Sequence, residues 1–378
     1  MRVYLDNAAT TRISEKALIA MGEVMRESWG NASSLHGMGL AAKGDVEKAR
    51  KIIGTQMGVD PARVVFTSGA TEANNTILRD YAIEGMNGGK RHLVVSAIEH
   101  ASVWEFCQFL KSVHGFELSV IQPDATGSVC AEEVERAIRH DTAFVAVMAV
   151  NNEVGTIQPF QSIHDLCRSY GVPYHCDFTQ AVGHTHIDGM DCASFSFSAH
   201  KFHGPKGVGA LVLPSGWRVR PILYGGSQEN GSRAGTENVE GIASMAVALC
   251  EQTNSAETSD RILNLKKLLW NGLRDSIDGV VLNGNIESSV PNILNVSFDG
   301  VYGDSLVYML SEAYGVYCST GSACCNGNTD PSRVLKAMGM SDNQALNAVR
   351  FSLSRYTTKE EIDYTIEAVK KSVLRIRR

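Results

Sequence analysis

Residues 63–75, RVVFTSGATEANN, hold a short apolar run that stops at a serine and a glycine and continues into a helical pattern. β-Branched and aromatic residues favour a strand, and Ser68-Gly69 ahead of Ala70-Thr71-Glu72 is typical of a helix start. The same order of apolar run, small or polar residues and helical pattern recurs at most of the later runs, which span 92–96, 142–150, 172–176, 193–197 and 207–213. This alternation predicts an α/β fold with a large, doubly wound and mostly parallel sheet.

Polar or small residues follow these six runs. The carboxyl ends of parallel strands meet at one edge of a sheet, and ligands of open α/β sheets bind at that edge. We therefore expect the segment TSGAT, His100, the segment NNEVG, Asp177 and Lys201 to approach one another there.

The chain is long enough for two domains, because its 378 residues exceed the ~250–300 at which a single core stops growing. Residues 252–260 are the most polar and least periodic stretch of the second half, which predicts a domain boundary there. Beyond it, residues 292–299 and 315–319 predict strands of a smaller α+β unit.

Composition excludes several classes of protein. The formal net charge of −6, from 35 basic and 41 acidic residues, argues against direct nucleic-acid binding. No apolar run reaches the ~18 residues of a membrane span, and Asp6 stands where a signal peptide needs an apolar core. The nine cysteines have no framework spacing, so we expect mostly reduced thiols in a cytoplasmic protein without a membrane partner.

Three features that occur in order along the chain suggest one cofactor. The helix start at Gly69-Ala70-Thr71 suits a phosphate, Asp177 ends an apolar run, and Lys201 ends another. Taken singly, the first two features are also explained as helix caps, and Lys201 is also explained as an ordinary surface lysine. Together they are what a protein supplies to pyridoxal phosphate, with His100 as a possible stacking or proton-transfer group.

A second cluster lies at 319–330, STGSACCNGNTD, which predicts a long loop carrying Cys324 and Cys325. A thiol on such a loop can attack at a buried cofactor and then pass its cargo to a partner; an accidental exposed pair is the alternative. Arg350 stands in a mostly apolar stretch, where either a substrate carboxylate or an internal salt bridge would satisfy its guanidinium.

These residues resemble the cysteine desulfurases of the NifS and IscS type, which are class V aminotransferases and fold-type I pyridoxal phosphate enzymes. The matching motifs cover almost the whole chain: YLDNAATT at 4–11, NASSLH at 31–36, TSGATEANN at 67–75, EH at 99–100, NNEVG at 151–155, DFTQ at 177–180, SFSAHKFHGPKGVGAL at 196–211, GSRAGTEN at 231–238, VPNILNVSF at 290–298, GSAC at 321–324 and RFSLSRYT at 350–357. With the resemblance in hand, we expect a large pyridoxal-phosphate domain at 13–256 and a small domain from both chain ends, at 1–12 plus 257–378, which carries the cysteine loop at about 319–331.

The resemblance implies a role for each matching residue. Lys201 would bond covalently to the cofactor, Asp177 would pair with its ring nitrogen, Gln180 would bind its phenolic oxygen, and His100 would stack on the ring and serve as an acid–base group. The phosphate would be held by Ala70, Thr71, Ser198 and His200, joined by Thr236 of a second subunit in a homodimer.

The resemblance also implies the reaction. Asn152, which also contacts the cofactor, and Arg350 would bind the carboxylate of L-cysteine, and Cys324 would take the sulfur as a persulfide, leaving alanine. The sulfur would pass to acceptor proteins such as an iron–sulfur scaffold or a thiolation enzyme. No resident metal is expected, although Cys324 could act as a transient iron–sulfur ligand.

Three positions depart from the family pattern: Ala32 where proline is common, Phe178 where a small residue is usual, and Cys325. We expect the first two to reshape the pocket slightly and Cys325 to be a bystander. Two other functions remain open, namely another pyridoxal phosphate lyase or transaminase such as a selenocysteine lyase, and a non-catalytic sulfur-relay or iron–sulfur scaffold.

Overall fold

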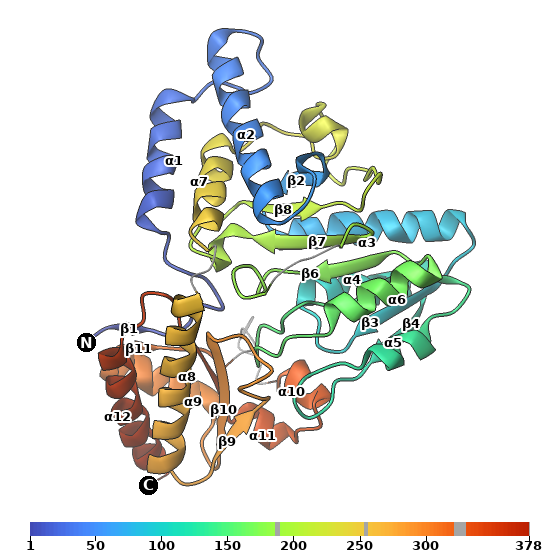
Figure 1. Cartoon of the computed structure of the whole chain (residues 1–378). Coiled ribbons are helices and arrows are strands. Elements are labelled where there is room, and N and C mark those ends of the chain that lie inside the picture. Colours follow the sequence, from blue (N-terminus) through green and yellow to red (C-terminus); the bar gives the residue numbers. More distant parts are fainter. Residues whose placement is uncertain (186–189, 253–255, 321–329, 378) are drawn as a thin grey trace.

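The computed structural model describes residues 1–185, 190–252, 256–320 and 330–377, and its larger part is organised by a seven-stranded sheet (Figure 1). The strand order is β2-β8-β7-β6-β5-β3-β4. Only β8 runs antiparallel to its neighbours, β2 and β7. The strands are β2 (Val64–Thr67), β3 (His92–Ser96), β4 (Glu117–Ile121), β5 (Thr142–Ala146), β6 (Tyr174–Asp177), β7 (Ala193–Ser198) and β8 (Gly209–Val212).

The direction of β8 corrects one expectation. The run at 207–213 was predicted to end at the same edge as the others, but because β8 is reversed, its beginning lies beside the ends of β2 and β7. Gly209 pairs with Thr67 and Ser198 there. A Cβ at Gly209 would lie 2.5 Å from the Phe197 carbonyl oxygen, so this close approach requires glycine.

Helices cover both faces of the sheet. Side chains alternate along each strand, so Val94 packs in one apolar cluster while Leu93 and Val95 pack in another. The helices on the Val95 side are α3 (Ala70–Asn87) and α4 (Ala101–His114), and those on the Val94 side are α2 (Gly37–Gln56), α5 (Ala131–Ala137), α6 (Phe160–Tyr170) and α7 (Val239–Cys250), with α1 (Glu15–Glu27) packed on α7.

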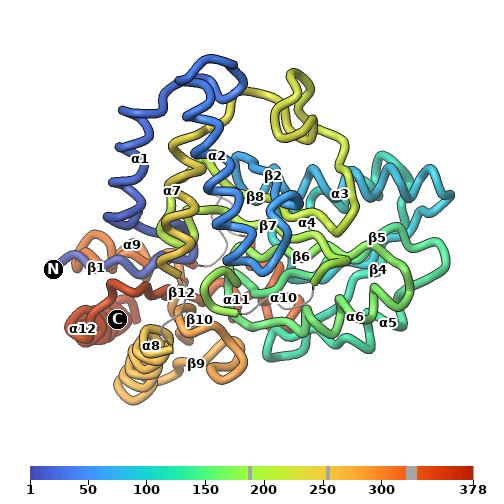
Figure 2. The backbone as a smooth tube through the Cα atoms, turned by 45° about the horizontal axis from the view of Figure 1, so that its top comes forward, coloured from blue at the N-terminus to red at the C-terminus, as the bar shows by residue number. Residues whose placement is uncertain are grey.

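A smaller unit holds both chain ends, and Figures 1 and 2 show the two termini together with its helices α8 (Ala256–Ser276), α9 (Gly303–Met309) and α12 (Lys359–Ile376). Its antiparallel sheet has the order β12-β10-β9, and β1 pairs in parallel with β11. Its elements are β1 (Val3–Tyr4), β9 (Val280–Asn283), β10 (Ile293–Phe298), β11 (Val316–Tyr317), β12 (Ala348–Ser352), α8 (Ala256–Ser276), α9 (Gly303–Met309), α10 (Arg333–Ala337), α11 (Asp342–Leu346) and α12 (Lys359–Ile376).

An apolar cluster of its own joins Val3 and Leu5 to side chains from 262 to 373. The first residues of the chain therefore pack with the last third, and we propose 13–256 and 1–12 plus 257–378 as the two domains. Among the described residues, no helix is long and apolar enough to cross a membrane.

Candidate active site

Lys201 ends a short 3₁₀ turn, η2 (Ala199–Lys201), that directly follows β7. Its Nζ donates hydrogen bonds to the carbonyl oxygens of Ala8, at 2.7 Å, and Ala9, at 2.8 Å. Burial and the nearby cation of Arg350 lower the pKa of Lys201 to about 8, against the opposing effect of Asp177 and Asp6. A substantial share of the amine is therefore neutral and nucleophilic near physiological pH.

Asp177 ends β6, the strand next to β7, and is buried. Its Oδ1 accepts the backbone N–H of Thr179 at 2.9 Å, and its Oδ2 accepts Nδ2 of Asn74 at 2.8 Å. Two N–H donors on one carboxylate suit its ionised form, which is the form that can hold a protonated ring nitrogen.

His100 is the N-cap residue of α4 and lies at the same edge, beyond the end of β3. Its Nδ1 is 2.8 Å from Oγ of Ser102 and accepts the backbone N–H of Ser102 at 3.1 Å. Desolvation lowers the pKa of His100, and the cations of Lys201 and Arg333 act in the same direction while Asp177 opposes them. The imidazole is therefore mainly neutral at physiological pH.

The first turn of α3 is the segment where the sequence predicts an anion site. The N–H of Ala70 donates to Oγ of Ser198, at the end of β7, at 2.7 Å. Thr71 is exposed one residue on, and Nδ1 of His200 lies 3.2 Å from Oγ1 of Thr10. First-turn N–H groups have no intrahelical acceptors, so this end of α3 can bind a phosphate beside Ser198.

Arg350, on β12, brings the smaller unit into the site. Its Nη2 forms an ion pair with Oδ1 of Asp6 at 2.9 Å, and its Nη1 donates to the carbonyl oxygen of Asn152 at 2.7 Å. The internal salt bridge considered for this residue is thus present, yet its buried Nε has no hydrogen-bond partner among the described residues. Gln180 completes the group by donating to the carbonyl oxygen of Ala8, which also accepts Nζ of Lys201.

Two predicted site residues are not seen with the others. Thr236 is exposed on the segment after η3 (Gln228–Gly231), and no hydrogen bond of the described residues joins it to this group. Cys324, like Cys325, lies outside the described residues. Cys318, which precedes them, is buried, and burial raises the pKa of its thiol, so it is a poor nucleophile.

Both described ends of the cysteine segment attach to the site. On one side, Ser319 and Arg350 exchange backbone hydrogen bonds. On the other side, the hydroxyl of Ser332 donates a hydrogen bond to Oε2 of Glu153, 2.5 Å away. The guanidinium of Arg333 donates to the carbonyl oxygens of Ala97 and Glu99.

The turn just before His100 is held by a buried carboxyl group. Burial raises the pKa of Glu99 to about 8, so this side chain is mainly protonated at neutral pH. Its Oε1 accepts the N–H of Met148 at 2.8 Å. Arg333 also stacks on the ring of Trp104, with its guanidinium carbon 4.4 Å from the centroid. These contacts fix the turn that presents His100.

The expected effect of Phe178 and Ala32 on the pocket is not seen. Phe178 is fully buried, and its ring packs against Phe160 and Phe195 with centroids 5.3 and 5.8 Å apart. Because successive residues of an extended segment point to opposite faces, the side chain after Asp177 enters the core. Ala32 is also part of that apolar cluster.

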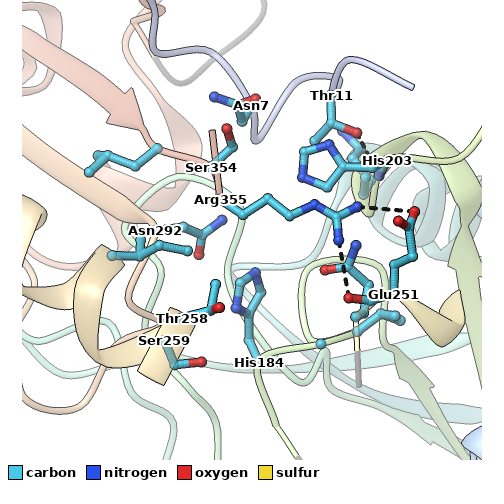
Figure 3. Close-up of a pocket in the computed structure, with 16 residues that line it drawn as sticks. Asn7, Thr11, His184, His203, Glu251, Thr258, Ser259, Asn292, Ser354 and Arg355 are labelled. Carbon is cyan, nitrogen blue, oxygen red and sulfur yellow. Dashed lines mark hydrogen bonds and ion pairs between the residues drawn. The ribbon is translucent and has the colours of Figure 1, made fainter. Parts of the chain in front are cut away.

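A cavity of about 280 Å³ lies behind Lys201, where the two units meet (Figure 3). Arg355 crosses it, with Nη1 donating to the carbonyl oxygen of Glu251 at 3.1 Å and Nη2 3.6 Å from its Oε2. Among the described residues, Nε of Arg355, Nδ1 of His184 and Oδ1 of Asn292 have no hydrogen-bond partner. The cavity is polar, and Lys201 and α8 both contribute to its lining.

The residues present fit pyridoxal phosphate. A lysine with a lowered pKa, a buried carboxylate and a helix N-terminus meet at one sheet edge, and the unpartnered Nε of Arg350 offers a donor for a further anion. The sequence does not single out Asn74, Ser102, His175 or Glu99 as site residues. Three of them, Asn74, His175 and Glu99, are marked only by being polar residues at buried positions. No group of three or more His, Cys, Asp or Glu side chains within the described ranges is arranged to hold a metal ion.

The chain is similar to known proteins over almost its whole length. The family model described as aminotransferase class-V matches residues 3–365. The chain is 42% identical to a protein named cysteine desulfurase IscS from Pectobacterium carotovorum subsp. carotovorum (strain PC1), over 99% of this chain and 93% of that one. It is 38% identical to one of the same name from Dictyoglomus turgidum, over 99% and 95%. A solved structure titled NifS-like protein superposes with a TM-score of 0.91 at 38% identity, covering 98% of this chain and 99% of that chain.

Proposed function

The chain belongs to the class-V aminotransferase family and is a cysteine desulfurase, and on this premise we propose how its residues divide the work. Lys201 holds pyridoxal phosphate covalently, Asp177 pairs with the ring nitrogen and Gln180 binds the phenolic oxygen. The phosphate lies at the start of α3, held by Ala70, Thr71, Ser198 and His200. The α/β fold expected from the sequence is confirmed by the seven-stranded sheet and the matching solved structure.

When bound, pyridoxal phosphate acts as an electron sink that makes the α-proton of its amino-acid substrate acidic. Asp177 keeps the ring nitrogen protonated, because its buried carboxylate is fixed by Asn74 and Thr179. Arg350 and Asn152 bind the carboxylate of L-cysteine, and Nε of Arg350 is the donor that still lacks an acceptor. Lys201, with its pKa of about 8, exchanges protons with the substrate carbon.

Cys324 is the proposed sulfur acceptor. Its thiolate attacks the sulfur of the substrate, the carbon–sulfur bond breaks, and the sulfur stays on Cys324 as a persulfide while the carbon skeleton leaves as alanine. The ends of its segment attach to Arg350 on one side and to Glu153 and Glu99 on the other, which supports delivery of the thiol to this site. An acceptor protein with its own thiolate, such as an iron–sulfur scaffold or a thiolation enzyme, then removes the sulfur by exchange.

The observation that carries this proposal is the approach of Lys201 and Asp177 at the ends of adjacent strands, beneath the first turn of α3. The test is the absorbance of the purified protein, which we expect to be yellow with a band that borohydride bleaches and that Lys201→Ala abolishes. Turnover of L-cysteine should fall more than about a thousandfold in that variant, because the amine that bonds covalently to the cofactor is removed. Lys206→Ala is the matched control, because Lys206 is exposed in the same segment. Retention of the bleachable band in Lys201→Ala would overturn the assignment.

We also propose a homodimer in which Thr236 serves the partner's site. Gln228 contacts both Gly235, whose N–H it accepts at 3.1 Å, and Ser33, whose Oγ is 3.5 Å away. The Thr236 segment therefore lies beside the 28–36 loop, where Trp29 is 73% and Leu35 is 92% exposed. Exposed apolar side chains around a binding segment favour burial against a second copy. We infer a cytoplasmic location, and the expected reduced thiols and a reaction that uses a free thiol support it.

The proposed homodimer can be tested by a substitution that disrupts its interface. Leu35→Glu should shift the sedimentation coefficient from that of a dimer towards that of a monomer and weaken cofactor binding, although Leu35 is not one of the proposed site residues. Leu374→Glu, at a leucine of α12 that is 52% exposed, is the control and should leave both unchanged. A wild-type chain that sediments as a monomer while binding the cofactor tightly would refute the shared site.

A further inference from the structure

Asn74 is a fully buried residue of α3 whose side-chain amide makes four hydrogen bonds. Its Nδ2 donates to Oδ2 of Asp177 and to Oγ of Ser102, each at 2.8 Å. Its Oδ1 lies 2.8 Å from Nε2 of His175 and accepts the hydroxyl of Ser196. The hydrogen-bonding capacity of the amide is therefore fully used.

The orientation of this amide follows from the partners. An ionised carboxylate only accepts hydrogen bonds, so the NH₂ group of Asn74 must face Asp177. The carbonyl oxygen then faces His175 and can only accept, so the proton of the neutral imidazole must be on Nε2. The amide thus sets the tautomer of His175.

Beyond His175 the hydrogen bonds continue in one direction. Nδ1 of His175 accepts the hydroxyl of Ser194 at 2.9 Å, and Ser194 accepts the hydroxyl of Tyr81 at 3.0 Å. Desolvation lowers the pKa of His175 to about 4, so the ring stays neutral. Every link from Tyr81 to Asp177 therefore donates towards the carboxylate, an arrangement in which hydrogen bonds polarise one another.

The second N–H of the Asn74 amide is connected to His100 through the hydroxyl of Ser102. Oγ of Ser102 accepts it, which leaves the hydroxyl proton of Ser102 to be donated to Nδ1 of His100 at 2.8 Å. The backbone N–H of Ser102 donates to the same Nδ1 at 3.1 Å, and a backbone N–H can only donate. Nδ1 of His100 therefore holds a lone pair, and Nε2 carries the proton.

We propose that Asn74 is a positioning residue that fixes the carboxylate of Asp177 and orients the hydroxyl of Ser102, and that the hydroxyl and backbone N–H of Ser102 together hold His100 as a neutral ring that acts in desulfuration as a hydrogen-bond donor through Nε2. This rests on the proposed function, because it assigns roles within that site. The Nε2 of such a ring already holds a proton, and its Nδ1 is taken by two donors. The α-proton of the substrate therefore moves to the amine of Lys201, where an N–H bond forms as the C–H bond breaks, and the same amine returns a proton to the product carbon.

The direct test is ¹⁵N NMR of the full-length protein labelled at histidine, recorded with and without cofactor. The His100 and His175 signals are assigned by their loss in His100→Gln and His175→Gln. At neutral pH both rings should be neutral with the proton on Nε2 and with Nδ1 unprotonated. A His100 ring protonated on Nδ1, or charged at neutral pH, would overturn the proposal.

Asn74→Ala and Asn75→Ala form a matched pair on the same helix. The side chain of Asn75 donates to the carbonyl oxygens of Thr71 and Ser102, and none of its hydrogen bonds among the described residues reaches Asp177 or His175. Asn74→Ala should let His175 sample both tautomers, raise the dissociation constant for pyridoxal phosphate by about tenfold or more, because a hydrogen bond to a charged group is lost, and change the pH dependence of the absorbance of the bound cofactor. Asn75→Ala should leave all three unchanged, and equal effects in the two variants would overturn the role of Asn74.

The outcomes separate this inference from the proposed function. The tautomers are read without turnover, so a chain with both rings in the proposed state that fails to release alanine from L-cysteine would refute the function and leave the tautomer assignment standing. A chain that releases alanine normally while His100 carries its proton on Nδ1 would refute the inference alone.

Discussion

The polar groups beneath Asp177 and those around the cavity behind Lys201 differ in how completely they are paired. Beneath Asp177, the side chains of Asn74, His175 and Ser194 are buried, and each has hydrogen-bond partners at or below about 3 Å. Around the cavity, Arg355 and Asn292 keep atoms without hydrogen-bond partners among the described residues (Figure 3). One region is a closed network and the other is a polar space with room for water.

This difference indicates what each region is for. A closed network has one arrangement, so it can fix the charge and direction of a carboxylate before any ligand binds. A polar cavity of about 280 Å³ can hold several waters, which replace a lost side-chain contact at little cost. We therefore expect substitutions in the network to be costly and those around the cavity to be tolerated.

The largest effect is expected at Cys324 and Cys325, which lie outside the described residues. Cys324→Ala should abolish sulfide release from L-cysteine while the bound cofactor keeps its absorbance, because the network that holds the ring is intact. Cys325→Ala should keep most of the activity. Sulfide release in the presence of a reductant is the measurement, and an inactive Cys325→Ala with an active Cys324→Ala would reverse the assignment.

The next effect compares two buried asparagines by the free energy of unfolding. Asn74→Ala leaves Nε2–H of His175 and the hydroxyl of Ser196 without their acceptor, which should cost about 1–3 kcal/mol. Asn292→Ala removes an oxygen that already lacks a partner and should change stability by less than about 0.5 kcal/mol. Urea unfolding of the cofactor-free chains measures both, and equal costs would remove the distinction between the two regions.

The last comparison concerns one histidine from each region. Burial lowers the pKa of both His175 and His184 from 6.5 to about 4. Between these values the unfolded chain binds a proton that the folded chain does not, so the stability present above pH 6.5 is lost as the pH falls towards 4. Each group contributes a slope of up to about 1.4 kcal/mol per pH unit.

Replacing either ring should therefore flatten the acid limb of the stability curve. His175→Gln and His184→Gln should do so to a similar extent when unfolding is measured across this pH range. Only His175→Gln should also weaken binding of pyridoxal phosphate, because only His175 belongs to the network that ends at Asp177. Weaker cofactor binding in His184→Gln would show that the cavity, too, supports the ring.

The predictable part of the site is the part that is local in the sequence. Asp177 and Lys201 each end an apolar run, and parallel strands bring such ends together, so both could be placed at one edge before the fold was known. The direction of β8 could not be predicted, because alternation of apolar residues is the same in both directions. The strand β4 was missed, since its side chains are only partly buried.

The network was not predictable for a different reason. Asn74 and Asn75 are adjacent, and only the phase of α3 against the sheet decides which of them reaches Asp177. His175 did give a signal, because a histidine inside the buried strand β6 must find partners, but the sequence does not say which. Thr236 remains a prediction that needs a second subunit.

A single turnover tests the central claim most directly. The purified protein with its cofactor is mixed with one equivalent of L-cysteine per chain and no acceptor, and the alanine released and the peptides are analysed by mass spectrometry. We expect alanine in equal amount to chains and one added sulfur atom on the peptide that carries Cys324. Alanine formed without added sulfur on that peptide, or sulfur found on Cys318 instead, would contradict the account.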